Sequence, residues 1–258
     1  MIGCPNHPRR DLLDEVRWIG ENGFGFVDLF LEPDRALPER TDVAELKRIL
    51  AGHRLSLVSH TAWYLPFGSP YPELRETAVK IVRGYLPFLQ ELGATAVTVH
   101  ASWASGLFED LECVGFQLLA LEELVREASR FGVRVLYEPL DTHRDTLENL
   151  GRILAGLPDL RVHIDMGHAH VRGIPPEAFF RTFPGKVEHI HVHDNLGRED
   201  LHLPIGAGTI PWKEYIPQIR RSYDGTLSLE IFSPDREYLL ISKRKLERYW
   251  QEAGSGTR

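Results

Sequence analysis

The chain has 258 residues, of which 43% are hydrophobic and 26% charged, a length that suits two small domains or one large α/β barrel. The formal net charge of -7 contains no long basic run, which disfavours a protein whose affinity depends on neutralising nucleic-acid phosphates. Two cysteines are too few for a disulfide framework or a thiolate zinc site, so any metal must use nitrogen and oxygen ligands.

The first residues contain no apolar signal core, and no apolar run reaches membrane-spanning length. We therefore expect a cytoplasmic protein that has no membrane partner.

Short apolar runs alternate with amphipathic segments along the first half of the chain. Strands are predicted over residues 1–4, 24–31, 55–60 and 95–100. Helices are predicted to follow them over 8–22, 43–51 and 72–92, and in a segment ending near residue 131. Each strand is thus followed by one helix.

The second half repeats the pattern, with strands predicted over 133–138, 160–165, 187–193 and 226–231. Helices are expected over 144–155, just after 175–176, over 212–221 and up to about 250, and residues 254–258 are predicted to form a frayed tail. Eight such units without a linker predict a single (β/α)8 TIM barrel domain over residues 1–258. An open doubly wound sheet is the main competitor, but no Gly-rich phosphate fingerprint follows any strand.

Imidazoles and carboxylates stand where most of these strands end. Because the carboxyl ends of barrel strands share one face, we expect these side chains to meet in one cup. The candidates at strand ends are His60, His100, Glu138, Asp165, His191 and Glu230, and those in the loops that follow are His168, Asp200 and His202.

This set has the chemistry of a metal site. Five imidazoles and four carboxylates suit zinc, manganese, cobalt or iron(II), and nine ligands exceed what one ion can use. The alternative for Glu138, Asp165 and Glu230 is pairing with arginines or helix capping. Each follows a buried run, however, where an unpaired charge is costly, so we favour a divalent metal, zinc or manganese, at one to three ions per chain.

Other side chains on the same face have less specific roles. His189, His191 and His193 alternate along one strand and point the same way, but His163 and His189 are expected one layer lower, in the core or behind the ligands. Loop aromatics are candidates for a wall around a sugar or base ring, with plain loop packing as the equal alternative: Trp63, Tyr64, Trp103 and Phe108. His7 and His170 are interpreted as ordinary structural histidines, with a position near the cup as the alternative.

Three segments resemble the xylose-isomerase-like barrel superfamily, which holds sugar isomerases, epimerases and endonuclease IV. They are residues 165–168 (Asp-Met-Gly-His), residues 189–195 (His-Ile-His-Val-His-Asp-Asn), and Asp200-Leu201-His202 with the Gly-Ala-Gly that follows. The single-metal ketose epimerases of this superfamily imply the ligands Glu138, Asp165, His191 and Glu230. The endonuclease IV branch implies a trinuclear zinc site that uses all nine candidates.

The resemblance implies two functions. The favoured one is a metal-dependent sugar or sugar-phosphate isomerase or epimerase acting on a carbohydrate through an enediolate, with Glu138 and Glu230 exchanging the proton and His168 orienting the substrate. The alternative is an endonuclease IV-like multinuclear zinc phosphodiesterase (AP endonuclease family 2). Pro139 and Ala207 depart from the endonuclease pattern, and the acidic balance makes nucleic acid an unlikely partner. A metal-binding protein without catalysis is a weaker third possibility.

Overall fold

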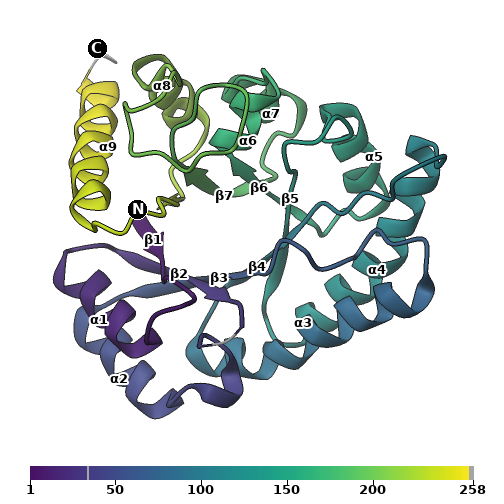
Figure 1. The fold of residues 1–258 in the computed structure, drawn as a ribbon, viewed down its shortest axis with the longest axis horizontal. Helices are drawn as coiled ribbons and strands as arrows, with labels where there is room; N and C mark the ends of the chain where they lie inside the picture. Colours follow the sequence, from purple (N-terminus) through teal and green to yellow (C-terminus); the bar gives the residue numbers. More distant parts are fainter. Residues whose placement is uncertain (34, 256–258) are drawn as a thin grey trace.

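The structure, a computed structural model, describes residues 1–33 and 35–255. Over these residues, eight parallel strands close into a barrel in which each strand pairs with the next along the chain and the last pairs with the first (Figure 1). The (β/α)8 prediction is confirmed. The strands are β1 (Ile2–Pro5), β2 (Phe26–Leu31), β3 (Ser56–Thr61), β4 (Ala96–His100), β5 (Arg134–Glu138), β6 (Arg161–Asp165), β7 (Val187–Val192) and β8 (Thr226–Leu229).

Helices surround the barrel, and local sequence explains where several begin. Asp42 caps α2 by accepting a hydrogen bond from the Glu45 amide, and Pro72 begins α3. The helices are α1 (Leu12–Glu21), α2 (Val43–His53), α3 (Pro72–Leu92), α4 (Asp110–Arg130), α5 (Leu147–Gly156), α6 (Met166–Val171), α7 (Pro176–Thr182), α8 (Trp212–Ser222) and α9 (Glu237–Ser255), with a 3-10 turn η1 (Pro38–Arg40).

Two predicted helix starts were wrong, and so were the loop placement of His168 and part of the predicted tail. Helix α1 begins at Leu12 because Asp11 caps it, and α5 begins at Leu147 because Thr146 caps it. His168 lies on the short helix α6 and not in a loop, and the Asp165 side chain caps that helix. The predicted frayed tail is helical as far as residue 255, and residues 256–258 lie outside the described part.

The two faces of each strand have opposite character. Outward residues such as Val97 and Ile190 belong to the apolar core between the strands and the helices. The interior of the barrel is polar, because hydrogen bonds cross it between side chains such as Thr98 and His163, whose Oγ1 and Nδ1 atoms are 3.0 Å apart. TIM barrels usually fill this space with branched apolar residues. The departure indicates that the interior supports a polar site above it.

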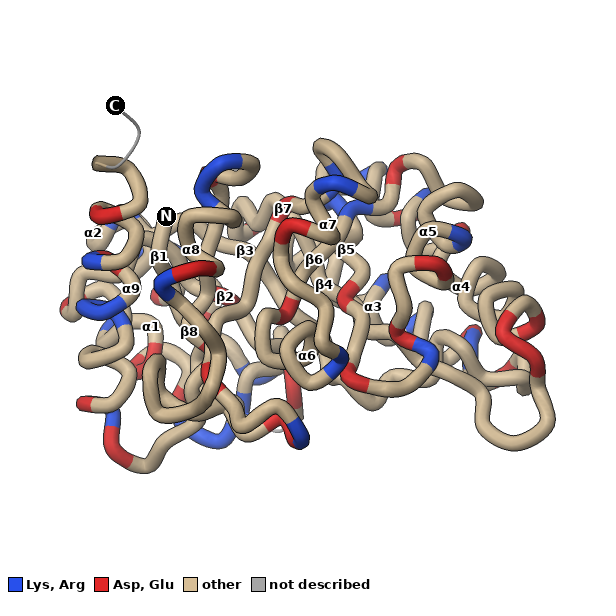
Figure 2. The backbone as a smooth tube through the Cα atoms, turned by 90° about the horizontal axis from the view of Figure 1, so that it is seen from above, with Lys and Arg blue, Asp and Glu red and all other residues tan. Residues whose placement is uncertain are grey.

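Charges of both signs are interspersed over the helices and loops, as Figure 2 shows. No helix in the described part of the chain is long and apolar enough to cross a membrane.

Candidate functional site

A cavity of about 550 Å³ opens where the strands end. Seven of the nine predicted ligands line it: His60, His100, Glu138, His168, Asp200, His202 and Glu230. The other two, Asp165 and His191, are buried and lie within ion-pairing distance of the lining residues. Side chains that are up to 170 residues apart in sequence therefore share one site. This follows because the carboxyl ends of all the parallel strands lie on one face of the closed barrel.

Glu138, the last residue of β5, lies at the centre of one half of the site. Its Oε2 atom is 3.1 Å from His60 Nε2, 3.2 Å from His100 Nε2 and 3.1 Å from His163 Nδ1. His163 was expected behind the ligands. It lies two residues before Asp165 on β6 and contacts Glu138. A carboxylate surrounded by three imidazoles can remain ionised at this depth, because each ring offers it a hydrogen-bond donor.

His191 joins the second half of the site. Its Nδ1 atom is 2.8 Å from Glu230 Oε2 and 3.7 Å from Asp165 Oδ2, and its ring lies within 4.8 Å of an oxygen of Glu138. The four residues that the epimerase resemblance implies are thus brought together by the ends of β5, β6, β7 and β8. Nearby nitrogen and oxygen atoms of this kind can hold one divalent ion.

Asp200 and His202 add a third group above Asp165. Asp200 Oδ2 is 3.3 Å from both His202 Nδ1 and His168 Nε2, and His202 Nε2 is 3.3 Å from Glu230 Oε2. His202 adopts a left-handed backbone conformation with φ of 49°, which is uncommon for a residue with a side chain. The nine predicted residues therefore form one continuous network.

His193 belongs to this network, although it was not predicted as a ligand. Its Nε2 atom is 3.0 Å from Asp165 Oδ1 and 3.3 Å from Asp200 Oδ1, and its ring stacks on His202 at a centroid distance of 4.2 Å. A Cβ at Gly167 would lie 1.9 Å from the His193 ring, so only glycine fits there. The two-residue spacing from His191 was the signal that could have identified His193.

Asp28 is the second group that sequence reasoning missed. It lies inside β2, is fully buried, and its Oδ2 atom accepts hydrogen bonds from His189 Nε2 at 3.1 Å and His191 Nε2 at 2.7 Å. The hydrogen bond to His191 holds the Nε2 proton and leaves Nδ1 facing Glu230 and Asp165. A lone acid within an otherwise apolar strand was the available signal.

Asp194 shapes the loop that carries Asp200 and His202. Its carboxylate accepts hydrogen bonds from the amides of Gly206 and Ile210 and from Trp212 Nε1, at 2.7 to 3.1 Å. A Cβ at Gly208 would lie 2.2 Å from the Asn195 carbonyl oxygen, which explains the second glycine of the Gly-Ala-Gly segment. This motif thus positions site residues without facing the cavity.

The carboxylates and imidazoles shift one another's pKa values. Burial alone would raise the pKa of Glu138, but His163 and His100 hold it well below its usual range. Burial would lower the pKa of His191, but Glu230 and Asp28 raise it well above the ordinary value. Likewise, Glu230 and Asp200 raise the pKa of His202 to about 9 against the effect of burial. The metal-free site therefore retains protons to balance its carboxylates.

The residues fit a divalent metal. Several buried atoms have no hydrogen bond to any described residue, which is costly for a polar atom unless a ligand meets it. A cation would also supply the positive charge that protons supply in its absence. The buried atoms of the network without a hydrogen bond are Nδ1 of His60, His100, His168 and His193, and Oδ1 of Asp200. Two of them, His168 Nδ1 and Asp200 Oδ1, have ion-pairing contacts only.

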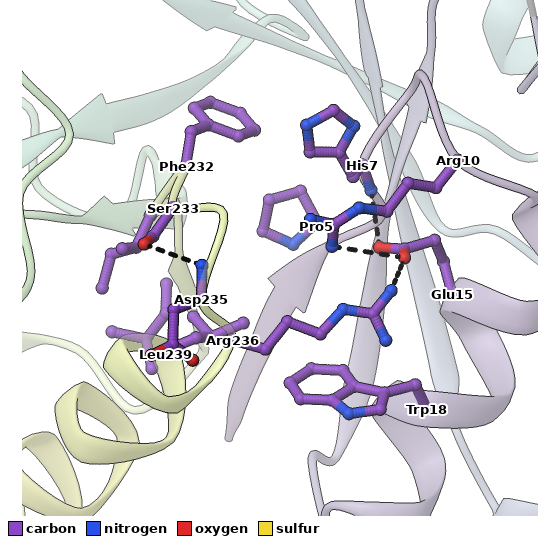
Figure 3. A pocket seen from close by; sticks show the side chains of 12 residues that line it. Pro5, His7, Arg10, Glu15, Trp18, Phe232, Ser233, Asp235, Arg236 and Leu239 are labelled. Carbon is purple, nitrogen blue, oxygen red and sulfur yellow. Dashed lines mark hydrogen bonds and ion pairs between the residues drawn. The ribbon is translucent and has the colours of Figure 1, made fainter.

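Only part of the expected aromatic wall surrounds the cavity. Trp63 and His7 line it, whereas Trp103 and Phe108 line a separate hollow and His170 contacts Thr209. Phe232, which was not predicted, completes the rim opposite His7 (Figure 3).

Below that rim, Figure 3 shows a smaller pocket in which Glu15 pairs with Arg10 and Arg236 and accepts a hydrogen bond from the His7 amide at 3.0 Å. Trp18 lies under the Arg236 guanidinium. Because its charges are already paired, this cluster fixes the rim between β1 and β8 and does not offer a second site.

The chain is similar in sequence and in fold to several known proteins. Fructoselysine 3-epimerase of Escherichia coli O157:H7 is 22% identical over 268 residues, covering 96% of each chain, and probable endonuclease 4 of Aquifex aeolicus is 27% identical over 197 residues, covering 68% of this chain and 69% of that protein. The crystal structure of a D-tagatose 3-epimerase-like protein superposes with a TM-score of 0.89 at 24% identity, covering 100% of this chain and 99% of the other. The family model of xylose isomerase-like TIM barrels matches residues 16–253, and the chain belongs to that family.

Proposed function

We propose that the protein is a metal-dependent sugar epimerase or isomerase that works through an enediolate. The observation that carries this proposal is the junction of Glu138, Asp165, His191 and Glu230 at the floor of a 550 Å³ cavity. A cavity of this volume admits a monosaccharide. The epimerase relatives match this chain over nearly its whole length and have the same fold, which supports a sugar substrate.

Glu138 and Glu230 are the proposed acid and base. They come from β5 and the end of β8, which β6 and β7 separate, so they reach the cavity from different sides of the barrel. One carboxylate removes the proton from the carbon beside the substrate carbonyl, and the other delivers a proton to the opposite face. A bound divalent ion would stabilise the negative charge that develops on the substrate oxygens.

The remaining polar groups have supporting roles in this proposal. His168 reaches both Glu138 and Asp200 and lines the cavity, which suits it to orient a substrate hydroxyl. Asp165 and His191 are buried below the lining and would hold the ion without contacting the sugar. Asp28 keeps the ring of His191 in place.

Proton exchange with solvent tests the proposal directly. Incubation of the Mn²⁺-loaded protein with a panel of ketoses and ketose phosphates in D₂O should place deuterium on carbon, which NMR detects. The control is the same panel with metal alone. Absence of label across the panel would contradict the proposal.

One observation supports a second candidate. The group of His193, Asp200 and His202 offers ligand atoms within 4.8 Å of one another, and together with the four residues below it could hold more than one ion, as an endonuclease IV-like phosphodiesterase would need. Cleavage of an oligonucleotide with an abasic site, lost in His202→Ala, tests this alternative. We favour the epimerase because Pro139 and Ala207 depart from the endonuclease pattern and the protein carries a net charge of -7.

A further inference from the structure

The cavity lining is rich in carboxylates and contains neither lysine nor arginine among its described residues. Five carboxylates line the cavity: Glu32, Glu138, Asp141, Asp200 and Glu230. Three of these face the histidines of the site. The other two carboxylates, Glu32 and Asp141, line the cavity away from these histidine contacts.

Glu32 and Asp141 make neither a hydrogen bond nor an ion pair within the described part of the chain. Glu32 directly follows β2 and is half-buried, and its carboxylate makes neither a hydrogen bond nor an ion pair with another described residue. Asp141, in the loop after β5, is half-buried and equally unpaired. Elsewhere in the described chain a half-buried carboxylate is paired, as Glu188 is with Arg134 and Arg161. A carboxylate that loses solvent without gaining a partner is costly, unless a ligand supplies the partner.

Aromatic rings accompany these carboxylates. Trp63 is 61% exposed and Phe232 is 43% exposed, and both line the same cavity. Large exposed rings on a concave surface mark a binding surface, and beside carboxylates they favour a cationic group, which is attracted to the faces of the rings as well as to the acids.

We propose that the substrate is a sugar that bears a positively charged amine, and that this amine lies against Glu32. A phosphorylated sugar is excluded. This inference rests on the proposed function, and it narrows its substrate class. A phosphate on a terminal carbon would meet the Glu32 and Asp141 carboxylates, and the lining contains neither a lysine nor an arginine to pair with it. An ammonium would make charge-assisted hydrogen bonds with the same groups.

Binding of sugar alcohols that cannot react tests the inference without depending on turnover. Calorimetry on the Mn²⁺-loaded protein compares sorbitol, 1-amino-1-deoxysorbitol and sorbitol 6-phosphate. We expect the amine to bind about ten- to a hundredfold more tightly than sorbitol, the range for one hydrogen bond to a charged group, and the phosphate to bind most weakly. Tighter binding of the phosphate, or equal binding of all three, overturns the proposal.

Two single-residue variants test whether Glu32 causes the preference for the amine. Glu32→Gln keeps the shape of the side chain and removes its charge, so the preference for the amine over sorbitol should fall toward one. Glu76→Gln, an exposed residue of α3, is the matched control and should keep the preference. An unchanged preference in Glu32→Gln overturns the assignment of Glu32. Because solvent exchange tests the epimerase and calorimetry tests the charge preference, either result can fail while the other stands.

Discussion

Asp28 Oδ2 lies 2.7 Å from His191 Nε2, and this hydrogen bond joins a fully buried acid on β2 to the imidazole at the centre of the proposed metal site. The same oxygen also accepts from His189 Nε2 at 3.1 Å. Burial would raise the pKa of Asp28, but His189 and His191 hold it well below its usual range, so it stays ionised. A carboxylate in this position fixes the histidine ring and increases its basicity toward a metal.

Asp28→Asn should therefore weaken metal binding. The amide has the same shape but no charge, and loss of such a partner typically costs about 10- to 100-fold in metal affinity. Competition with a chromophoric chelator measures the dissociation constant, and Co²⁺ absorption reports ligand geometry. Ser228→Ala is the control, because that buried hydroxyl has no hydrogen bond within the described chain. If Asp28→Asn bound metal as tightly as the unmodified protein, Asp28 would have no role at the site.

Glu138→Gln and Glu230→Gln should each lower the rate of deuterium incorporation by at least about 100-fold, because each removes both a proposed proton-transfer group and a proposed ligand. Initial rates on the best ketose of the panel, followed by NMR, provide the measurement. Glu76→Gln serves again as the exposed control. Full activity in Glu138→Gln would remove that residue from the site.

Metal removal should destabilise the fold. A ligand that binds the folded state alone adds about 4 kcal/mol at a concentration of 1,000 times its dissociation constant. The melting temperature should fall after treatment with chelator and recover when Zn²⁺ or Mn²⁺ is added. A melting curve that does not respond, in a protein that contains no metal by elemental analysis, would rule out a bound ion.

Much of this site could be predicted from sequence because of one regularity: the carboxyl ends of the parallel strands of a barrel all lie on the same face, around one cup. His60, His100 and Glu138 were identified in this way. Asp28 was missed because it lies inside its strand and not at the end. Its place in an apolar run marks it as unusual, but its role depends on two histidines more than 160 residues away.

Local detail escaped prediction for a different reason. The short helix α6 has six residues, too few for a helical period to stand out from a loop. The loop that holds Asp200 is fixed by the hydrogen bonds of Asp194, which join residues up to 18 positions apart. No local propensity encodes contacts of that range.

The number of bound ions should separate the two functional candidates. If the protein is a one-metal epimerase, Glu138, Asp165, His191 and Glu230 suffice, so reconstituted protein should contain about one ion per chain, and His202→Ala should retain it. Elemental analysis after removal of excess metal gives the count. Two or three ions per chain, reduced in His202→Ala together with loss of abasic-site cleavage, would favour the phosphodiesterase.

The pH dependence of stability should reverse when metal is bound. The pKa of His202 is raised from 6.5 to about 9, so in the metal-free protein the folded state holds this proton more tightly than the unfolded state. The resulting stability is fully present below pH 6.5 and is lost as the pH rises through about 9. The loss is on the order of 3 kcal/mol or less, since the side chain is 22% exposed.

In the metal-loaded protein the ion replaces the proton, and rising pH favours binding because the ligands must be deprotonated. We therefore expect the free energy of unfolding, measured with urea between pH 6 and 10, to fall with pH in the presence of chelator and to stay level or rise in the presence of Mn²⁺. His202→Gln should make the chelator curve less steep, because the glutamine has no proton to lose, while the raised pKa of His191 keeps part of the slope. A chelator curve that is already flat in the unmodified protein, or one equally steep in His202→Gln, would show that the folded protein does not hold a proton on His202.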